Sequence, residues 1–346
     1  MTSCKLRIKF VSFSLCLALL CHFLPAYATD AKPDAKPDTK PNTSIDKKTE
    51  TPVTLDNKRP AVIALNDWAS QRVLSWVVGR LLTEMKVPVV YQDIKVDDQW
   101  GAFRLGLLDV QVELWQGTNF KRYDQHILKG FIVNAGNHTA TAREEWWYPS
   151  YVKPMCPGLP DWRALLKCSN VFATPDSAGR GVYYSGQWNT KGGIRVRALN
   201  LNFNIKRLED DAALWQLLWQ SMKQRKPIIM INWTPNWTDT RLIGEFVEFP
   251  PYDDLCVTYA SWGLNKTLRY DCGNPISGWV KKIVSPRFEK NHPCAFRALK
   301  KVAFTTQMMS EAAALVITDK YTEQQAAIKW MEMFKTQWEE WVGEGC

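Results

Sequence analysis

Short apolar runs alternate with amphipathic stretches along most of the chain. The run AVIAL at 61–65 is followed by residues 69–84, in which Val73, Val77 and Leu81 recur every four positions. Such spacing places apolar side chains on one face of an α-helix, whereas a short continuous apolar run is typical of a buried strand. The pattern therefore predicts a strand over 61–65 and a helix over 69–84.

The same alternation continues to the end of the chain. The predicted elements are a strand over 87–94, a helix over 99–108, a strand over 110–115, a strand over 201–205, a helix over 209–226, a strand over 227–232, a strand over 278–284 and a helical tail over 322–342. Strands that alternate with helices indicate parallel sheets covered by helices on both faces. The predicted fold class is therefore α/β.

Three tryptophans stand at comparable places in this pattern. Trp68, Trp115 and Trp233 each lie at or just beyond the carboxyl end of a predicted strand. In open α/β sheets, ligands bind outside the carboxyl ends of the strands. Two α/β units in one chain also predict two lobes, so these tryptophans are candidates for a binding site.

The first 28 residues have the composition of an export signal. Lys5, Arg7 and Lys9 precede the apolar stretch 10–24, and the sequence AYA at 26–28 offers small residues where a signal peptidase reads them. No later segment has the roughly 20 uninterrupted apolar residues of a membrane span. We expect residues 1–28 to be cleaved and the mature protein to be exported and soluble.

Residues 29–58 differ from everything that follows. They contain the repeat DAKPDAKPDTKP, which lacks apolar side chains to bury and favours an extended backbone. We expect a disordered linker here, with a docking tail as the alternative, and folded material from about Arg59.

Cysteine usage agrees with export. Three of the nine cysteines lie in the signal, which leaves an even number for disulfides. Lipidation of Cys21 is disfavoured because Leu19 and Leu20 stand where small residues would be needed. A zinc site is the competing interpretation of the other six, but no CxxC spacing exists and the histidines are far apart. The predicted pairs are Cys156 with Cys168, Cys256 with Cys272, and Cys294 with Cys346.

The net charge and the sequence motifs limit the classes of function that we expect. The formal net charge is +9, and removal of the three basic residues of the signal leaves +6, with basic residues dispersed rather than gathered in a stripe. Nucleic acid is therefore not an expected partner. The chain has no GxSxG, HExxH or GxxxxGK[ST] motif, so we expect neither an enzyme nor a cofactor. Asp253 and Asp254 could bind calcium, although a turn is the simpler interpretation.

The chain has 17 tryptophans, an unusual number. Most large aromatic side chains pack in cores, and we expect this for the tryptophans of the tail. A quaternary ammonium ion, however, cannot donate a hydrogen bond, and it is held by the faces of aromatic rings, each of which contributes about 0.5–2 kcal/mol. The shared position of three tryptophans at strand ends favours such a cage.

Five stretches of the sequence are shared with a known family. They are WASQRVLSWVVGRLL from Trp68, GLLDVQVELWQGTN around Trp115, WWYPSYV at 146–152, CPGLPDW at 156–162 and INWTPNWT around Trp233. Together they resemble the periplasmic binding proteins that feed ABC importers with glycine betaine and related quaternary amines. The resemblance implies a two-lobed periplasmic binding fold of type II, in which hinge strands join the lobes and the ligand lies in the cleft between them.

The resemblance also implies boundaries and site residues. Lobe one would be 59–145 plus 277–346, and lobe two 146–276. The first lobe would supply Trp68 and Trp115 and the second Trp233, so that closure around the ligand assembles the cage.

Further candidates are less strongly placed. Trp188 follows a glycine-containing turn, and Trp162 begins a helix inside the predicted Cys156–Cys168 loop; either could be cavity wall or core. Trp237 is expected to pack in the core. No metal-binding residues are predicted.

Glu144 and Glu145 stand at the expected crossing between lobes, and either could face the cleft or solvent. A glutamate in the cleft suits choline, whose hydroxyl can donate to it, or trimethylamine N-oxide, to which a protonated glutamate can donate. It suits glycine betaine less, because it would repel the carboxylate of that ligand.

The function implied is that of a monomeric periplasmic binding protein that captures a methylated amine such as glycine betaine, choline or trimethylamine N-oxide and delivers it to a membrane permease. An enzyme and an envelope protein that binds carbohydrate through exposed tryptophans are the rival interpretations.

Overall fold

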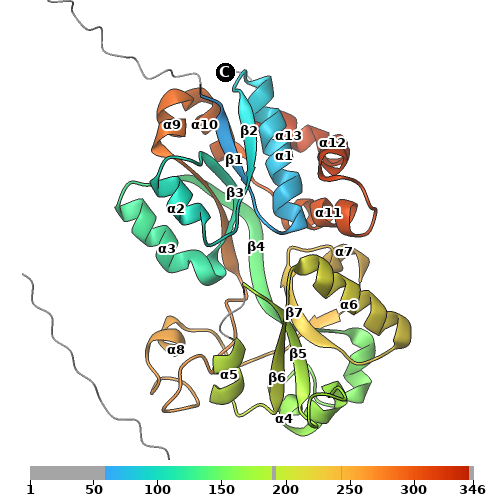
Figure 1. Ribbon diagram of the computed structural model, residues 1–346. Helices are drawn as coiled ribbons and strands as arrows, with labels where there is room; N and C mark the ends of the chain where they lie inside the picture. Colours follow the sequence, from blue (N-terminus) through green and yellow to red (C-terminus); the bar gives the residue numbers. More distant parts are fainter. Residues whose placement is uncertain (1–58, 189–191, 243, 343–346) are drawn as a thin grey trace, which may run out of the picture. The chain divides into compact units, whose positions relative to one another are not determined.

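The computed structural model describes residues 59–188, 192–242 and 244–342, which belong to one compact unit. The predicted signal at 1–28 and linker at 29–58 lie outside the described residues. Within the described residues, nine strands form a mixed sheet in the order β2-β1-β3-β9-β4-β7-β5-β6, with β8 paired to β4 (Figure 1). The strands are β1 Ala61–Leu65, β2 Val89–Asp93, β3 Val110–Trp115, β4 Val133–Pro149, β5 Gly181–Gly186, β6 Phe203–Leu208, β7 Ile229–Thr234, β8 Gly244–Phe246 and β9 Gly278–Val284.

Helices cover the sheet and connect its strands (Figure 1). They are α1 Ala69–Glu84, α2 Gln99–Arg104, α3 Gln116–Leu128, α4 Leu165–Cys168, α5 Gly192–Ala198, α6 Asp211–Gln224, α7 Thr238–Arg241, α8 Asp254–Thr258, α9 Pro286–Asn291, α10 Pro293–Lys301, α11 Thr306–Ile317, α12 Glu323–Met333 and α13 Lys335–Val342, with 3-10 turns at Ser150–Met155, Trp162–Ala164 and Ser169–Phe172. The predicted helix over 69–84 is confirmed as α1.

Two predicted helices differ from the structure. The helix expected over 99–108 stops at Arg104, because Gly106 adopts a left-handed conformation with φ +67° that ends the helix. The tail expected as one helix over 322–342 is divided into α12 and α13 at Phe334. Its tryptophans do pack in the core, since Trp330 is fully buried and its indole N–H donates to the Met308 carbonyl at 2.7 Å.

Parallel pairing holds in only part of the sheet. β1 pairs in parallel with β2 and β3, and β5 pairs in parallel with β6 and β7. β9 runs antiparallel to β3 and β4, and β4 runs antiparallel to β7 and β8. The expectation of parallel sheets was therefore wrong for β9, and β4 and β8 were not predicted as strands. β4 and β9 lie between the two parallel groups, where antiparallel pairing needs no crossover helix.

One long strand, β4, changes its partner along its length. Residues 133–142 of β4 pair with β9, whereas residues 143–147 pair with β7. We call β1, β2, β3, β9 and the first part of β4 the first section, and β5–β8 with the rest of β4 the second section (Figure 1). The continuous backbone of β4 links the two sections.

Each section has its own apolar core. In the first, α1 and α11–α13 pack on the sheet through residues such as Leu74, Met309 and Trp330. In the second, the rings of Trp146 and Tyr183 stack with centroids 3.9 Å apart inside a separate buried cluster. Among the described residues, no helix is long and apolar enough to cross a membrane.

Two of the three predicted disulfides are formed. Cys156 bonds to Cys168 and Cys256 bonds to Cys272, so each closes a short loop in the chain between β4 and β9. Cys346 lies outside the described residues, and its pairing with Cys294 stays a prediction.

Candidate functional site

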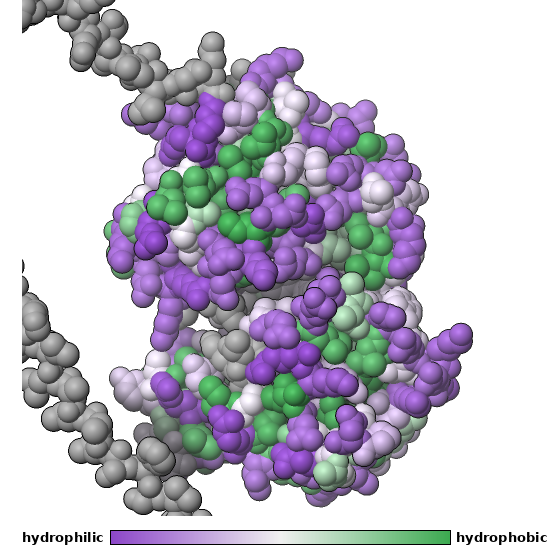
Figure 2. All heavy atoms as spheres, viewed as in Figure 1, coloured by the Kyte–Doolittle hydropathy of each residue, from purple (hydrophilic) through white to green (hydrophobic). Residues whose placement is uncertain are grey.

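A cavity of about 310 Å³ is lined by residues from both sections of the sheet. Figure 2 shows the surface hollowed along the boundary between the sections, with hydrophilic side chains on both edges of the hollow. Five of the six predicted site residues line this cavity: Trp68, Trp115, Glu144, Trp188 and Trp233. We refer to the four tryptophans among them as the tryptophan cage.

The first section contributes two rings of the cage. Trp68 has an extended backbone directly before α1, and Trp115 occupies the equivalent position between β3 and α3. Both indole N–H groups donate to one oxygen, Oε1 of Glu113, at 2.6 Å from Trp68 and 2.8 Å from Trp115. The Ser70 hydroxyl donates to the same oxygen at 3.0 Å. A single carboxylate therefore holds two rings that are 47 positions apart in the sequence.

Glu113 lies behind the cavity wall, with no exposed surface. Burial raises the pKa of its carboxyl group from 4.5 to about 7, although the hydrogen bonds from Trp68, Trp115 and Ser70 act in the opposite direction. Its second oxygen, Oε2, is buried and has no hydrogen-bond partner in the part of the chain that the structure describes. Sequence reasoning missed this residue, whose only signal is one acid inside the apolar strand VQVELW.

We expect Glu113 to make the stability of the protein depend on pH. Because its pKa is higher in the folded chain, the folded state holds the proton more tightly, so this contribution is present at low pH and is lost as pH rises toward 7. The free energy of unfolding of Glu113→Gln, relative to wild type, should increase by about 2–3 kcal/mol between pH 5 and pH 8. Urea unfolding at the two pH values measures this difference. An unchanged difference would contradict the raised pKa, and Glu332→Gln on the exposed face of α12 is the matched control.

The second section contributes the other two rings. Trp233 lies near the end of β7, and its ring contacts Trp188 edge to face with centroids 5.9 Å apart. Trp188 follows β5, and its ring covers Gly186 so closely that a Cβ there would lie 2.0 Å from the indole. Because the glycine at the end of this strand has no side chain, the Trp188 ring fits against it in the cavity wall. On its other side Trp233 packs against Trp215.

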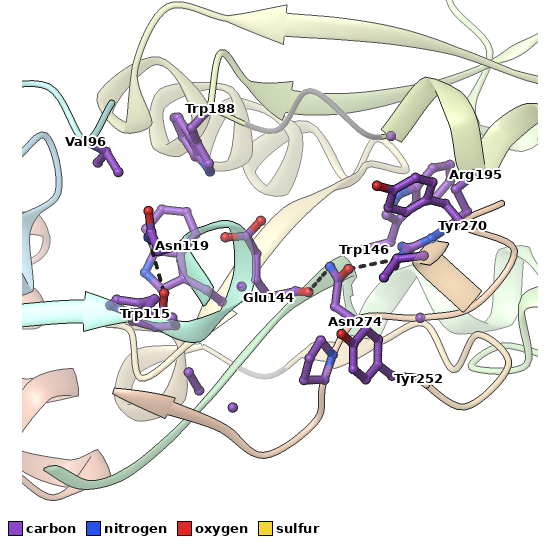
Figure 3. A pocket seen from close by; sticks show the side chains of 18 of the residues that line it. Val96, Trp115, Asn119, Glu144, Trp146, Trp188, Arg195, Tyr252, Tyr270 and Asn274 are labelled. Carbon is purple, nitrogen blue, oxygen red and sulfur yellow. Dashed lines mark hydrogen bonds between the residues drawn. The ribbon is translucent and has the colours of Figure 1, made fainter. Parts of the chain in front are cut away.

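Glu144 and Glu145 point to opposite sides of β4, as successive strand residues do. Glu144 lines the cavity, and its carboxylate points into the space between Trp115 and Trp188 (Figure 3). Glu145 is buried, forms an ion pair with Arg195 and accepts a hydrogen bond from the Asn274 backbone N–H at 2.9 Å. The structure thus assigns the cleft-facing position to Glu144.

Arg195 ties three segments together at the opposite end of the cavity from Trp115 (Figure 3). Besides its ion pair with Glu145, it donates to the Asn274 side-chain oxygen at 3.1 Å and lies over the Phe249 ring at 4.6 Å. The Asn274 side chain donates in turn to the Glu144 carbonyl. This network joins α5, β4 and the segment before β9, where the chain passes between the two sections.

Two carboxylates that sequence reasoning missed lie on the cavity wall. Burial raises the pKa of Asp211, at the start of α6, to about 6, and it also raises the pKa of Asp67. Tyr252, which precedes the Cys256–Cys272 loop, and Tyr270, which lies within it, line the wall beside Asn274, as does Trp146 of β4 (Figure 3).

The structure does not bring Trp162 to the cavity. Trp162 is 7% exposed and packs in the second core beside the Cys156–Cys168 disulfide, with the Arg163 guanidinium over its ring. Trp237 is fully buried against Trp215, as expected for a core residue.

No group of three or more histidine, cysteine, aspartate or glutamate side chains among the described residues is arranged to hold a metal ion. Asp253 instead accepts a hydrogen bond from the Leu255 backbone N–H at 2.7 Å and caps α8. Asp254 is the first residue of α8, so this pair of acids begins a short helix rather than a turn.

Comparison with known proteins gives a consistent family. Residues 59–333 match the model of the substrate-binding domain of the ABC-type glycine betaine transport system. The chain is 36% identical over 292 residues to the trimethylamine N-oxide-binding protein of Pelagibacter ubique (strain HTCC1062), which covers 82% of this chain and 90% of that protein.

Solved structures show the same fold. Lactococcal OpuAC in its closed form with glycine betaine has a TM-score of 0.61 at 17% identity and covers 82% of this chain and 100% of its own. A choline-binding protein in complex with choline has a TM-score of 0.62 at 13% identity and covers 82% of this chain and 92% of its own. The predicted two-lobed α/β periplasmic binding fold is confirmed.

Proposed function

The chain belongs to the family of substrate-binding domains of ABC-type glycine betaine transport systems, and from this premise we propose that it captures a small methylated amine in the tryptophan-lined cavity. The single observation that carries the proposal is the meeting of five tryptophans, the four of the tryptophan cage and Trp146, from both sections of the sheet around one cavity of about 310 Å³. Rings on several sides suit a head group covered with methyl groups, which attracts ring faces and offers no hydrogen to donate.

In this site each residue has a distinct role. Trp68, Trp115, Trp188 and Trp233 surround the methylated nitrogen, and Glu144 meets the polar end of the ligand. The ligand enters when the two sections move apart, and all four rings come together when the sections close around it. Since only the closed form presents every ring, binding energy drives closure.

Trimethylamine N-oxide is the ligand that we propose first, with choline and glycine betaine as alternatives. Support comes from the 36% identical relative that carries the name of a trimethylamine N-oxide-binding protein. The wall also bears the carboxylates of Asp67, Glu144 and Asp211. A fourth carboxylate, that of glycine betaine, would be repelled by these acids, whereas the carboxyl group of Glu144 donates well to an N-oxide oxygen when it carries a proton.

The wider arrangement follows from the same premise. The two lobes comprise residues 59–145 plus 277–346 and residues 146–276, a division supported by the change of β4 partner between Ala142 and Arg143.

Proteins of this family act outside the cytoplasm with an ABC transporter. We assign this one to the periplasm, to which residues 1–28 direct it, and we propose that it binds its permease as a monomer.

Titration calorimetry with trimethylamine N-oxide, choline, glycine betaine and a neutral sugar tests the function. Saturable binding of at least one methylated amine, with no heat from the sugar, is expected. Binding of the sugar alone would overturn the proposal in favour of a carbohydrate-binding protein.

Glu144→Gln tests the ligand class. The neutral amide is a weaker partner for the choline hydroxyl and the N-oxide oxygen, and it no longer repels a carboxylate. We expect the affinities for choline and the N-oxide to fall about tenfold and that for glycine betaine to fall less or to rise. Equal changes for all three ligands would remove Glu144 from the ligand contacts, and Glu339→Gln on α13 serves as the control.

A further inference from the structure

Glu113 differs from the acids of the cavity wall in its position. Asp67, Glu144 and Asp211 line the cavity, whereas Glu113 has no exposed surface and touches the cage from behind. It reaches the rings through their indole N–H groups, which form the electropositive edges of these side chains. A ligand in the cavity and Glu113 therefore lie on different sides of the same two tryptophans.

We propose that Glu113 is the positioning residue of the tryptophan cage and the source of its preference for cationic ligands. Its carboxylate fixes Trp68 and Trp115 by their N–H groups. The same carboxylate favours a cationic head group over an uncharged one of the same shape. This inference rests on the proposed function. It concerns how the site distinguishes ligands of similar shape.

The positioning role follows from the hydrogen bonds. Both indoles and the Ser70 hydroxyl converge on one oxygen, Oε1, at 2.6–3.0 Å. Each bond removes the freedom of a ring to turn about its side-chain torsions, and the common acceptor fixes the two rings relative to each other. Binding sites whose contact residues are held by such supporting hydrogen bonds lose less entropy when the ligand arrives.

The preference for charge follows from the environment of the carboxylate. Burial raises the pKa of Glu113, its three neutral hydrogen-bond donors act in the opposite direction, and no cation is among its hydrogen-bond partners in the described part of the chain. Its negative charge is therefore not cancelled locally. In a site with little water such a charge at the ring edges attracts a cation that lies against the ring faces, and it also polarises these rings.

Two substitutions separate the roles. Glu113→Gln keeps an oxygen that accepts from both indoles but removes the charge. Glu113→Asp keeps the charge but withdraws the acceptor by the length of one methylene group. Glu323→Gln is the matched control. Glu323 also accepts a hydrogen bond from an indole N–H, that of Trp76 at 3.2 Å, but neither Glu323 nor Trp76 lines the cavity.

The ligands are choline, trimethylamine N-oxide and 3,3-dimethylbutan-1-ol, the uncharged carbon analogue of choline, with affinities measured by calorimetry at pH 8. We expect Glu113→Gln to weaken choline roughly ten- to thirtyfold, the dipolar N-oxide a few fold and the uncharged alcohol not at all. Glu113→Asp should weaken all three by a similar factor, and Glu323→Gln none of them. Equal losses of all three ligands in Glu113→Gln, or no loss of choline, would overturn the charge role.

A measurement on the ligand-free protein keeps this test distinct from that of the proposed function. Ultraviolet resonance Raman spectra report the strength of hydrogen bonds at indole N–H groups. The spectrum should shift toward weaker bonding in Glu113→Gln and further in Glu113→Asp, with far-UV circular dichroism unchanged. An unshifted spectrum would overturn the positioning role even if all ligands bind, whereas absence of binding by wild type would overturn the proposed function alone.

Discussion

Replacement of Trp233 by alanine is expected to weaken binding of trimethylamine N-oxide about 100-fold. The substitution removes one ring face from the cation and leaves water where the ligand was covered. Trp115→Ala should act in the same way from the other section of the sheet, since both rings line one cavity. Calorimetry measures the affinities, and far-UV circular dichroism should stay unchanged.

The control for this experiment is Trp219→Ala. Trp219 stacks on Trp237 with centroids 4.9 Å apart, is 39% exposed and is not among the residues that line the cavity. Its loss removes an indole of the same size without touching the ligand, so the affinity should stay at the wild-type value. Trp233→Ala with normal affinity would show that this ring is not part of the cage.

Arg195→Met is expected to lower the free energy of unfolding by about 3–5 kcal/mol, the usual effect of leaving a buried charge without its partner. The partner is Glu145, which is 2% exposed and lies where β4 passes from one section to the other. Urea unfolding monitored by circular dichroism measures the loss. The loss of the contact with Asn274 should also weaken ligand binding, because the wall beside Glu144 is no longer held.

A second variant distinguishes a lost ion pair from lost packing. Glu145→Leu combined with Arg195→Met replaces both charges by apolar groups, and most of the stability should return. Lys329→Met, which breaks the exposed pair with Glu332, should change stability by less than about 1 kcal/mol. If the double variant is as unstable as Arg195→Met alone, then packing rather than charge explains the loss.

Local pattern predicted much of the fold. The four-residue repeat in 69–84 identified α1, because the helical period decides which side chains can reach a core. The directions of β4 and β9 were not predictable in the same way. Apolar runs of similar length occur in both parallel and antiparallel strands, and the direction of a strand depends on how the chain returns between the sections.

The same contrast holds within the site. Trp68, Trp115 and Trp233 were identified as cavity candidates because each follows a strand, and the end of a strand is visible in the sequence. Tyr270 and Asn274 were missed, because they lie in a segment without helical or strand period that a disulfide and long-range hydrogen bonds hold in place.

The alternation along β4 restricts how this strand can change during evolution. Glu144 and Trp146 line the cavity, while Glu145 between them is buried on the other face of the strand. Deletion of a single residue upstream would exchange the two faces, so that the acid now paired with Arg195 would project into the ligand space and its neighbour into the core. Insertions and deletions in this strand are therefore tolerable only in steps of two, whereas substitutions at Glu144 alone can alter the ligand without disturbing the link between the lobes.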